Sequence, residues 1–372
     1  MTPLVFGDFE SRSRADLKKI GGRNYAEHPT TEPLCCVMLV RTEAGDEWIE
    51  WARGDAPPSL PPVFDLVAHN GVNFDRHLWA RLGWPSPRRH IDTMQLAKVG
   101  GFPSAKLEWL AESLLGISKD MAGNKLTLSL SAVSRAKKTL GQYRTPITPA
   151  ILERVIAYCR TDVEIMARLY DEHLADWLDC DLPGLEEAER ACNDRGIAFD
   201  RELAEMLIAA DECLGEQACA AAGVDAATVR SPVKFRAALH ALGCFVPDAT
   251  ADTLEGVLPG ATPAVAALIR ARQATSSIAA GKLRAGLLRC SPDGRLRDNT
   301  TYMGAHTGRW SGVGMQLQNM AAGNVLDIDA SIALLEAGEL ACVRIVDGAP
   351  VRHALEAGDV NTLTRACLRS AV

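Results

Sequence analysis

Apolar and polar positions in the first third of the chain follow the pattern of alternating strands and helices. Short apolar runs with β-type content are LVFGDFES, LCCVMLV, DEWIEWA and DLVAH. Helical spacing occurs in VNFDRHLWARLG, which ends at a glycine, and in AKLEWLAESLLG. Strands interleaved with helices predict an α/β layer fold for this part of the chain.

The pattern changes to long helices further along. Thr148 and Pro149 form a helix start, because threonine caps a helix and proline favours its first position. Apolar spacing then continues for about seven turns, until Pro183. Alanine- and leucine-rich helical patterns such as RELAEMLIAADECLGEQACAAAG follow, and β-type content returns only near residue 296. We therefore expect three parts: residues 1–180, 181–298 and 299–372.

Composition excludes several classes of protein. The chain has 372 residues, of which 47% are hydrophobic and 23% charged, so it is globular rather than disordered or fibrous. No apolar run reaches the ~18 residues that span a bilayer, and the N-terminus lacks the basic region of a signal peptide. We expect a cytoplasmic protein with no membrane partner. Eleven scattered cysteines without a C-x-x-C spacing indicate reduced thiols, mostly buried, rather than disulfides or zinc.

Two acids stand at the end of the first apolar run. Asp8 and Glu10 are two positions apart, so on a strand their carboxylates face the same side. Like charges so placed repel each other unless a cation lies between them, and hard divalent cations prefer such oxygen ligands. A solvated strand end is the alternative interpretation of this pair taken alone.

Two further groups of residues carry candidate chemistry. Asn70, Phe74 and Asp75 lie in NGVNFD, where Asp75 falls in the first turn of a predicted helix and Phe74 anchors that turn. Tyr158 and Asp162 are four positions apart on the predicted helix that starts at Thr148, so they share one face. A phenol beside a carboxylate suits metal-assisted hydrolysis. Taken alone, each group is also compatible with a structural role.

Together, D-x-E, N-x3-F-D and Y-x3-D resemble the three motifs of DEDD-type 3′–5′ exonucleases of the tyrosine-bearing subclass. The resemblance spans residues 4–178. The intervening SRSRADLKKIGGRNYAEHPTTEPL and IDTMQLAKVGGFPSAKLEWLAESLLG are similar to the proofreading domains of phage-type family A DNA polymerases. The resemblance implies a ribonuclease-H-like exonuclease domain over residues 1–180, a mixed sheet flanked by helices.

The resemblance also implies roles for single residues. Two divalent metal ions, Mg²⁺ or Mn²⁺, would be held by Asp8, Glu10, Asp75 and Asp162. Tyr158 would position or activate the attacking water, and Asn70 and Phe74 would lie near the DNA. The implied reaction releases nucleoside 5′-monophosphates from DNA 3′ ends. For Asp92 we expect a cap or supporting role rather than a fifth metal ligand.

The second half carries a second resemblance. LEEAERACNDRGIAFD and RSPVKFRAALHALG are similar to the helical region that joins exonuclease and polymerase in the same enzymes, which makes residues 181–298 thumb-like. TTYMGAHTGRWSGVGMQLQNM resembles the stretch before the palm, which implies primer–template contacts for Arg309, Gln318 and Asn319. Eight basic residues against two acidic ones between Arg270 and Arg309 agree with phosphate contact, although a solvated face is the alternative.

The chain departs from the family at its end. QNMAAGN lacks the proline and arginine that commonly follow QN, and the palm and fingers motifs do not occur, so we expect no nucleotide addition by this chain alone. Residues 299–372 would be a truncated palm entrance. Three alternatives stay open. They are a fragment, a DNA-binding assembly subunit of a split polymerase with a separate palm and fingers chain, and an RNA 3′-exonuclease.

Overall fold

The chain forms two compact units, each built from two segments. The structure, a computed structural model, describes residues 2–118, 120–133, 141–180, 185–275, 278–305, 307–320 and 323–368. The first unit comprises Met1–Gly196 and Arg297–Gly314, and the second comprises Ile197–Leu296 and Met315–Val372. The first segment of the second unit is therefore inserted into the first unit along the sequence.

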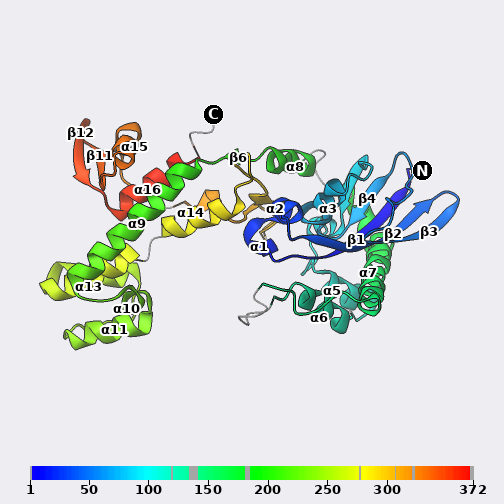
Figure 1. The fold of residues 1–372 in the computed structure, drawn as a ribbon, viewed down its shortest axis with the longest axis horizontal. Coiled ribbons are helices and arrows are strands. Elements are labelled where there is room, and N and C mark those ends of the chain that lie inside the picture. The colour runs from blue at the N-terminus through cyan, green and yellow to red at the C-terminus, as the bar shows by residue number, and fades with distance from the viewer. Residues whose placement is uncertain are drawn as a thin grey trace. The chain divides into compact units, whose positions relative to one another are not determined.

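A mixed five-stranded sheet is the centre of the first unit (Figure 1). In spatial order its strands are β3 (Gly45–Ala52), β2 (Glu32–Thr42), β1 (Leu4–Arg12), β4 (Asp65–Ala68) and β5 (Arg89–Asp92). The contacts of β2 with β1 and β3 are antiparallel, whereas β1, β4 and β5 run parallel. The α/β prediction is confirmed, and the four predicted strands all form.

The first unit contains the helices predicted at VNFDRHLWARLG, at AKLEWLAESLLG, after Thr148 and at LEEAERACNDRG, together with others that were not predicted. Its helices are α1 (Leu17–Ile20), α2 (Gly22–Glu27), α3 (Asp75–Arg81), α4 (Thr93–Val99), α5 (Leu107–Leu110), α6 (Met121–Leu130), α7 (Pro149–Leu169) and α8 (Leu185–Arg195). Thr148 caps α7 by accepting a hydrogen bond from the Ile151 backbone N–H, as predicted. The α-helical part of this segment ends at Leu169, earlier than expected, and continues as a π turn and a 3-10 turn to Trp177.

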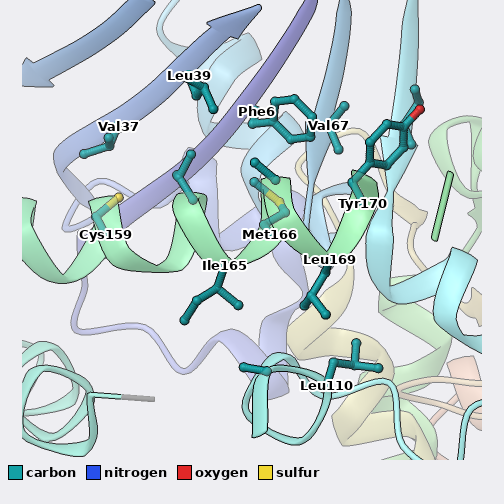
Figure 2. Close-up of a cluster of buried hydrophobic side chains, with 14 of the residues drawn as sticks. Phe6, Val37, Leu39, Val67, Leu110, Cys159, Ile165, Met166, Leu169 and Tyr170 are labelled. Carbon is teal, nitrogen blue, oxygen red and sulfur yellow. The ribbon is translucent and has the colours of Figure 1, made fainter. Parts of the chain in front are cut away.

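Alternation along the strands separates two hydrophobic cores, one on each face of the sheet. On one face Val5 and Phe9 pack with Trp79 of α3, among others. On the other face Phe6 packs against α7. Figure 2 shows α7 between two layers on that second face: Cys159 points toward the strands, whereas Leu169 points toward the side on which Leu110 of α5 lies. Helix α7 is therefore held on both sides, which fixes its register against β1.

The segment Arg297–Gly314 is attached to α8 mainly by hydrogen bonds. The side chain of Asn193 accepts from the backbone N–H groups of Asn299 and Thr300 and donates to the Thr300 carbonyl at 3.0 Å. The Arg297 guanidinium donates to the Asp194 carbonyl at 2.8 Å. The short strands β8 (Thr300–Thr301) and β9 (Ser311–Gly312) then pair as a hairpin.

A charged cluster connects this segment to α3. The guanidinium of Arg76, whose side chain is 9% exposed, lies 2.9 Å from the Asp194 carboxylate and 3.7 Å from that of Asp298. Arg23 also pairs with Asp194, at 2.5 Å. Residues from α2, α3, α8 and the returning segment thus share one ion-pair network.

Arg76→Met is expected to destabilise the chain by about 3 kcal/mol, because it takes the guanidinium from the largely buried Asp298 and leaves Asp194 with only that of Arg23. Urea unfolding of the first unit measures the change. Arg168→Met is the matched control, since Arg168 makes an exposed pair with Glu172. It should cost no more than about 0.5 kcal/mol. Equal effects of the two substitutions would contradict the conclusion that Arg76 stabilises the fold through a buried ion-pair network.

The contact between Glu189 and the β8–β9 hairpin should make the stability of the fold depend on pH. Its carboxylate is buried and accepts hydrogen bonds from the Thr300 side chain and the Tyr302 backbone, with Lys98 and Asn193 beside it. Burial outweighs these contacts and raises the pKa of Glu189 from 4.5 to about 7. The protonated form is therefore favoured by folding. Its stabilising contribution is present below pH 4.5 and is lost as the pH rises through about 7.

We expect Glu189→Gln to be more stable than the wild type at pH 8, by on the order of 2 kcal/mol, and nearly equal to it at pH 5. Urea unfolding at the two pH values measures this difference. Glu187→Gln, an exposed position on the same helix, is the control and should show no such trend. If the difference in unfolding free energy between Glu189→Gln and the wild type does not change with pH, burial does not raise the pKa of Glu189.

The second unit is mainly helical, as predicted. Its helices are α9 (Arg201–Ala222), α10 (Ala226–Arg230), α11 (Pro232–Ala241), α12 (Ala251–Val257), α13 (Pro263–Thr275), α14 (Ile278–Arg289), α15 (Ile328–Glu336) and α16 (Ala357–Ala366). Strands β6 (Ile197–Ala198) and β7 (Arg295–Leu296) pair with each other. A small antiparallel sheet contains β10 (Leu326–Asp327), β11 (Ala341–Val346) and β12 (Ala349–Ala354). This sheet was not predicted from the sequence.

The compact units do not follow the expected boundaries at 180 and 298. Helix α8 lies in the first unit, and the segment expected to open the palm entrance is divided between the units at Gly314. The physical reason is the set of polar contacts that Asn193, Asp194 and Asp298 make. The three functional domains expected from the sequence stay a prediction.

Candidate active site

Asp8 and Glu10 occupy the second half of β1. Strand β1 pairs with β4 only over Leu4–Phe6, so within the described ranges its later residues have no neighbouring strand on that side. Asp8 lies on the face of Phe6, toward α7, and is half-buried. The register with β2 shifts between Glu10 and Ser11, which ends the regular strand just after the second acid. The two carboxylates therefore stand where the sheet opens.

Asp75 reaches β1 from the first turn of α3. Its Oδ1 accepts a hydrogen bond of 3.0 Å from the backbone N–H of Phe9, between the two acids of β1. The Asp75 side chain is 3% exposed. Phe74 packs against the ring of Tyr25, with centroids 5.9 Å apart. The N-x3-F-D motif thus places a buried carboxylate against the opening of the sheet.

Asn70 and Asp92 shape the turn before α3. Asn70 has φ 60°, in the left-handed region, and its Oδ1 accepts from the Asn73 side chain at 2.9 Å. The Asp92 carboxylate accepts from the backbone N–H groups of Asn70 and Val72 and also caps α4. The expected cap role of Asp92 is confirmed. In this structure Asn70 supports the turn; contact with a substrate stays a prediction.

Tyr158 and Asp162 lie one turn apart on α7, as their spacing predicts. Both are buried, with 5% and 6% exposure, and their side chains are hydrogen-bonded to each other. Between them in sequence, the thiol of Cys159 donates to the carbonyl of Asp8 at 3.1 Å and lies 3.3 Å from its carboxylate. Helix α7 therefore contacts the first motif directly.

The pKa values show that the acids affect one another. Burial, and next the negative charge of Asp8, raise the pKa of Asp75 well above its ordinary value, although the Phe9 N–H opposes this. Burial likewise raises the pKa of Tyr158, followed by the charges of Asp162 and Glu10. The phenol is therefore protonated at neutral pH. The other three acids of the motifs therefore act on these two groups: Asp8 on both, and Glu10 and Asp162 on Tyr158.

The donor set fits a hard divalent cation by its chemistry. Four carboxylates supply only oxygen ligands, and a cation between them would offset the burial and repulsion that raise the pKa of Asp75. In the described ranges, however, no three His, Cys, Asp or Glu side chains are already grouped as a ligand set. The residue types fit a divalent metal ion, but in the part of the chain that the structure describes the side chains are not arranged at coordination distance of one point.

The predicted DNA contacts of the second half lie elsewhere in the chain. Arg309 is exposed on the hairpin of the first unit, whereas Gln318 and Asn319 are exposed in a 3-10 turn of the second unit. Asn319 donates to the side chain of Gln316 at 3.2 Å. All three side chains are accessible, and their contact with DNA stays a prediction.

Sequence reasoning missed two residues beside the site. Cys159 was grouped with the buried thiols, and none of the eleven cysteines, which all lie within the described ranges, is in a disulfide. The available signal for Cys159 was its spacing of four residues from Val155 and from Val163, which puts it on the apolar stripe of α7 that packs against the sheet. Gly123 of α6 lies against the Tyr158 ring and gave no signal in the sequence, since α6 carries no recognised motif.

Comparisons with known proteins agree with this geometry. Residues 60–174, which include Asp75, Tyr158 and Asp162, match the RNase_H_2 family of the RNase_H superfamily. Over 366 residues the chain is 25% identical to a DNA polymerase of Bacillus phage SP02, covering 92% of this chain and 55% of the relative. In the described ranges no helix has the length and apolar character that crossing a membrane requires.

A solved structure shares the fold along most of the chain. It is the POL domain of Pol1 from M. smegmatis in complex with DNA primer-template and dNTP, with a TM-score of 0.54 at 18% identity. The match covers 84% of this chain and 52% of that one, so the chain spans about half the length of either relative. The predicted ribonuclease-H-like fold and the resemblance to phage DNA polymerases are confirmed: residues 60–174 match the RNase_H superfamily, in a chain that is similar to a phage DNA polymerase over most of its length.

Proposed function

We propose that the first unit is a metal-dependent 3′–5′ exonuclease that removes nucleoside 5′-monophosphates from DNA 3′ ends, as in proofreading. The observation that carries the proposal is the placement of Asp75. Its buried carboxylate is hydrogen-bonded to the central strand β1 between Asp8 and Glu10, beyond the residues of β1 that pair with β4. A carboxylate whose pKa is raised by burial and by a like charge is typical of a functional site.

The proposed cofactor is a pair of Mg²⁺ or Mn²⁺ ions. The residues that would hold them are Asp8, Glu10, Asp75 and Asp162. When bound, such ions supply positive charge to the attacking and leaving oxygens of an in-line phosphodiester displacement. The chain contributes acids fixed from three directions, by strand β1, by the first turn of α3 and by α7. It also provides a partly desolvated place, in which charges interact more strongly than in water.

Tyr158 would orient the attacking water rather than deprotonate it. Its raised pKa keeps the phenol protonated at neutral pH, so the oxygen can donate one hydrogen bond and accept others. Its hydrogen bond with Asp162 fixes the ring one turn from a proposed metal ligand. Orientation of this kind lowers the entropic part of the barrier.

DNA is the proposed substrate, because a DNA-polymerase-like sequence continues through the second unit. Arg309, Gln318 and Asn319 are proposed to contact the DNA, and a separate palm and fingers chain is a further proposed partner. Arginine is suited to phosphate contact by its fixed fork of donors. These proposals concern the whole protein, whereas the exonuclease proposal concerns the first unit.

The proposal is tested with the purified full chain and short single-stranded DNA labelled at either end. With Mg²⁺ or Mn²⁺, the 5′-labelled strand should shorten one nucleotide at a time, and the 3′ label should appear at once as a mononucleotide. EDTA should stop both reactions. The same sequence in RNA distinguishes an RNA exonuclease, and circular DNA excludes an endonuclease. Absence of degradation with either metal, in a folded chain, would overturn the proposal.

A further inference from the structure

Helix α6 approaches the ring of Tyr158 at a position that has no side chain. Gly123 of α6 is buried, and a Cβ built on it would lie 2.4 Å from Cδ2 and 2.9 Å from Cγ of Tyr158. Both distances are too short for real atoms, and the Tyr158 ring, at 5% exposure, has little room to move. The phenol of Tyr158 can therefore occupy its position only because residue 123 is a glycine.

The backbone conformation at position 123 does not explain why this residue is a glycine. Gly123 is in the first turn of α6 with helical geometry, and in a helix alanine is favoured over glycine. Gly281 of α14 is a contrasting case, since a Cβ there would have no atom within 4 Å. At Gly123, by contrast, a close approach between two helices occupies the space that a methyl group would need.

The C-terminal end of α6 is tied to the rest of the first unit, which limits a shift of the helix: Leu130 is buried in the core that contains α7, and the Ser131 hydroxyl accepts from the backbone N–H of Ser13 at 3.2 Å. The Asp120 carboxylate caps α6 by accepting from the backbone N–H groups of Ala122 and Gly123, at 2.9 and 3.0 Å. The second oxygen of Asp120 would lie 2.6 Å from the added Cβ, but this side chain is exposed and can rotate. The buried Tyr158 ring is therefore the neighbour that must yield.

We infer that Gly123 is a positioning residue for Tyr158 in the exonuclease reaction, an inference that rests on the proposed function. A side chain at position 123 displaces the phenol from Asp162 without removing any group that reacts. The expected signature is a loss in turnover with unchanged DNA binding, because a misplaced phenol orients the water poorly while the DNA contacts stay intact.

Steady-state kinetics on single-stranded DNA supply the first test. Gly123→Ala should lower kcat about tenfold or more and leave KM within about twofold. Adding Gly123→Ala to Tyr158→Phe should have no further effect, because the phenol is already absent, whereas independent effects would multiply. Gly281→Ala is the matched control and should leave kcat unchanged. Multiplying effects, or an unchanged kcat for Gly123→Ala, would overturn the inference.

A spectroscopic test is independent of activity. The chain contains five tyrosines, so after incorporation of 3-fluorotyrosine the fluorine signal of position 158 is assigned by its absence in Tyr158→Phe. Gly123→Ala should move this signal, and Gly281→Ala should not. If the wild type proves inactive, the proposed function fails, and the fluorine signal alone then decides whether Gly123 places the ring. An unmoved signal overturns the inference.

Folding provides the remaining check. If Gly123→Ala fails to fold, Tyr158→Ala in the same chain vacates the space of the ring, and the double variant should fold again. Recovery of the folded state, measured by circular dichroism and thermal melting, supports the close contact. A double variant that stays unfolded would show that Gly123 is required for another reason.

Discussion

Asp75→Asn is expected to lower DNA hydrolysis by about 10³-fold or more, because it removes a charged ligand of the proposed metal ions. The same substitution should not destabilise the metal-free protein at neutral pH. Asparagine keeps an oxygen that accepts from the Phe9 N–H, and it lacks the charge that burial and Asp8 disfavour. Because the pKa of Asp75 is raised in the folded state, its protonated form stabilises the fold, and that contribution is lost as the pH rises. Initial rates and urea unfolding in EDTA measure the two effects.

Thermal melting with added Mn²⁺ separates the loss of a metal ligand from damage to the fold. The wild type should melt at a higher temperature with Mn²⁺ than with EDTA, since an ion that binds only the folded chain stabilises it. Asp75→Asn should lose most of this shift. Asp225→Asn is the control, an exposed carboxylate of the second unit that caps α10. Near-full activity of Asp75→Asn would show that Asp75 is not a metal ligand. In the same way, near-full activity of Asp8→Ala or Asp162→Ala would show that Asp8 or Asp162 is not one.

A chain without the inserted segment is expected to keep the first unit folded. Ala198 and Arg295 are paired antiparallel neighbours, so a two-residue Asn-Gly turn can join them in place of residues 199–294. The shortened chain ends at Gly314 and carries Leu296→Thr, because Leu296 packs in the core of the second unit. It should retain cooperative unfolding and metal-dependent hydrolysis of DNA.

Simple truncation after Gly196 should give a much weaker fold. That fragment lacks Asp298, which pairs with Arg76, and Thr300, which bonds to Asn193. Loss of partners in this network should cost about 3–5 kcal/mol, a large share of the stability of an ordinary domain. Urea unfolding of the two chains, side by side, measures the difference. Identical midpoints would show that the returning segment adds nothing to the first unit.

Local signals in the sequence predicted the parts of the fold that depend on periodicity and capping. Alternation along LVFGDFES places Phe6 and Asp8 on the face toward α7, and Thr148-Pro149 starts α7 with the cap that the structure has. Because Tyr158 and Asp162 follow that cap on one helix face, their proximity was predictable from spacing alone. The identities of strands β1–β4 and of helices α3, α5 and α7 were therefore within reach of the sequence, whereas β5, α4 and α6 were not predicted.

Contacts between distant polar groups could not be predicted in this way. Asn193 and Thr300 are 107 positions apart, and a hydrogen bond between them leaves no periodic pattern in either segment. The return of Arg297–Gly314 to the first unit depends on such contacts and on the Arg76 network, so the expected boundary at 298 did not reveal it. The approach of Gly123 to Tyr158 is a second example, because a close contact between helices is a property of packing rather than of sequence pattern.

The interrupted first unit has a consequence for how the chain is made. The ribosome completes Gly196 and then synthesises the whole inserted segment before Arg297 and Asp298 emerge. At about 5–20 residues per second this takes roughly 5–20 s. During that interval the nascent sheet and α3 are present, but Arg76 has only part of its ion-pair network. The first unit thus begins to fold first and finishes after the inserted segment has been made, so it offers incompletely paired surface to chaperones for longer than an uninterrupted domain would.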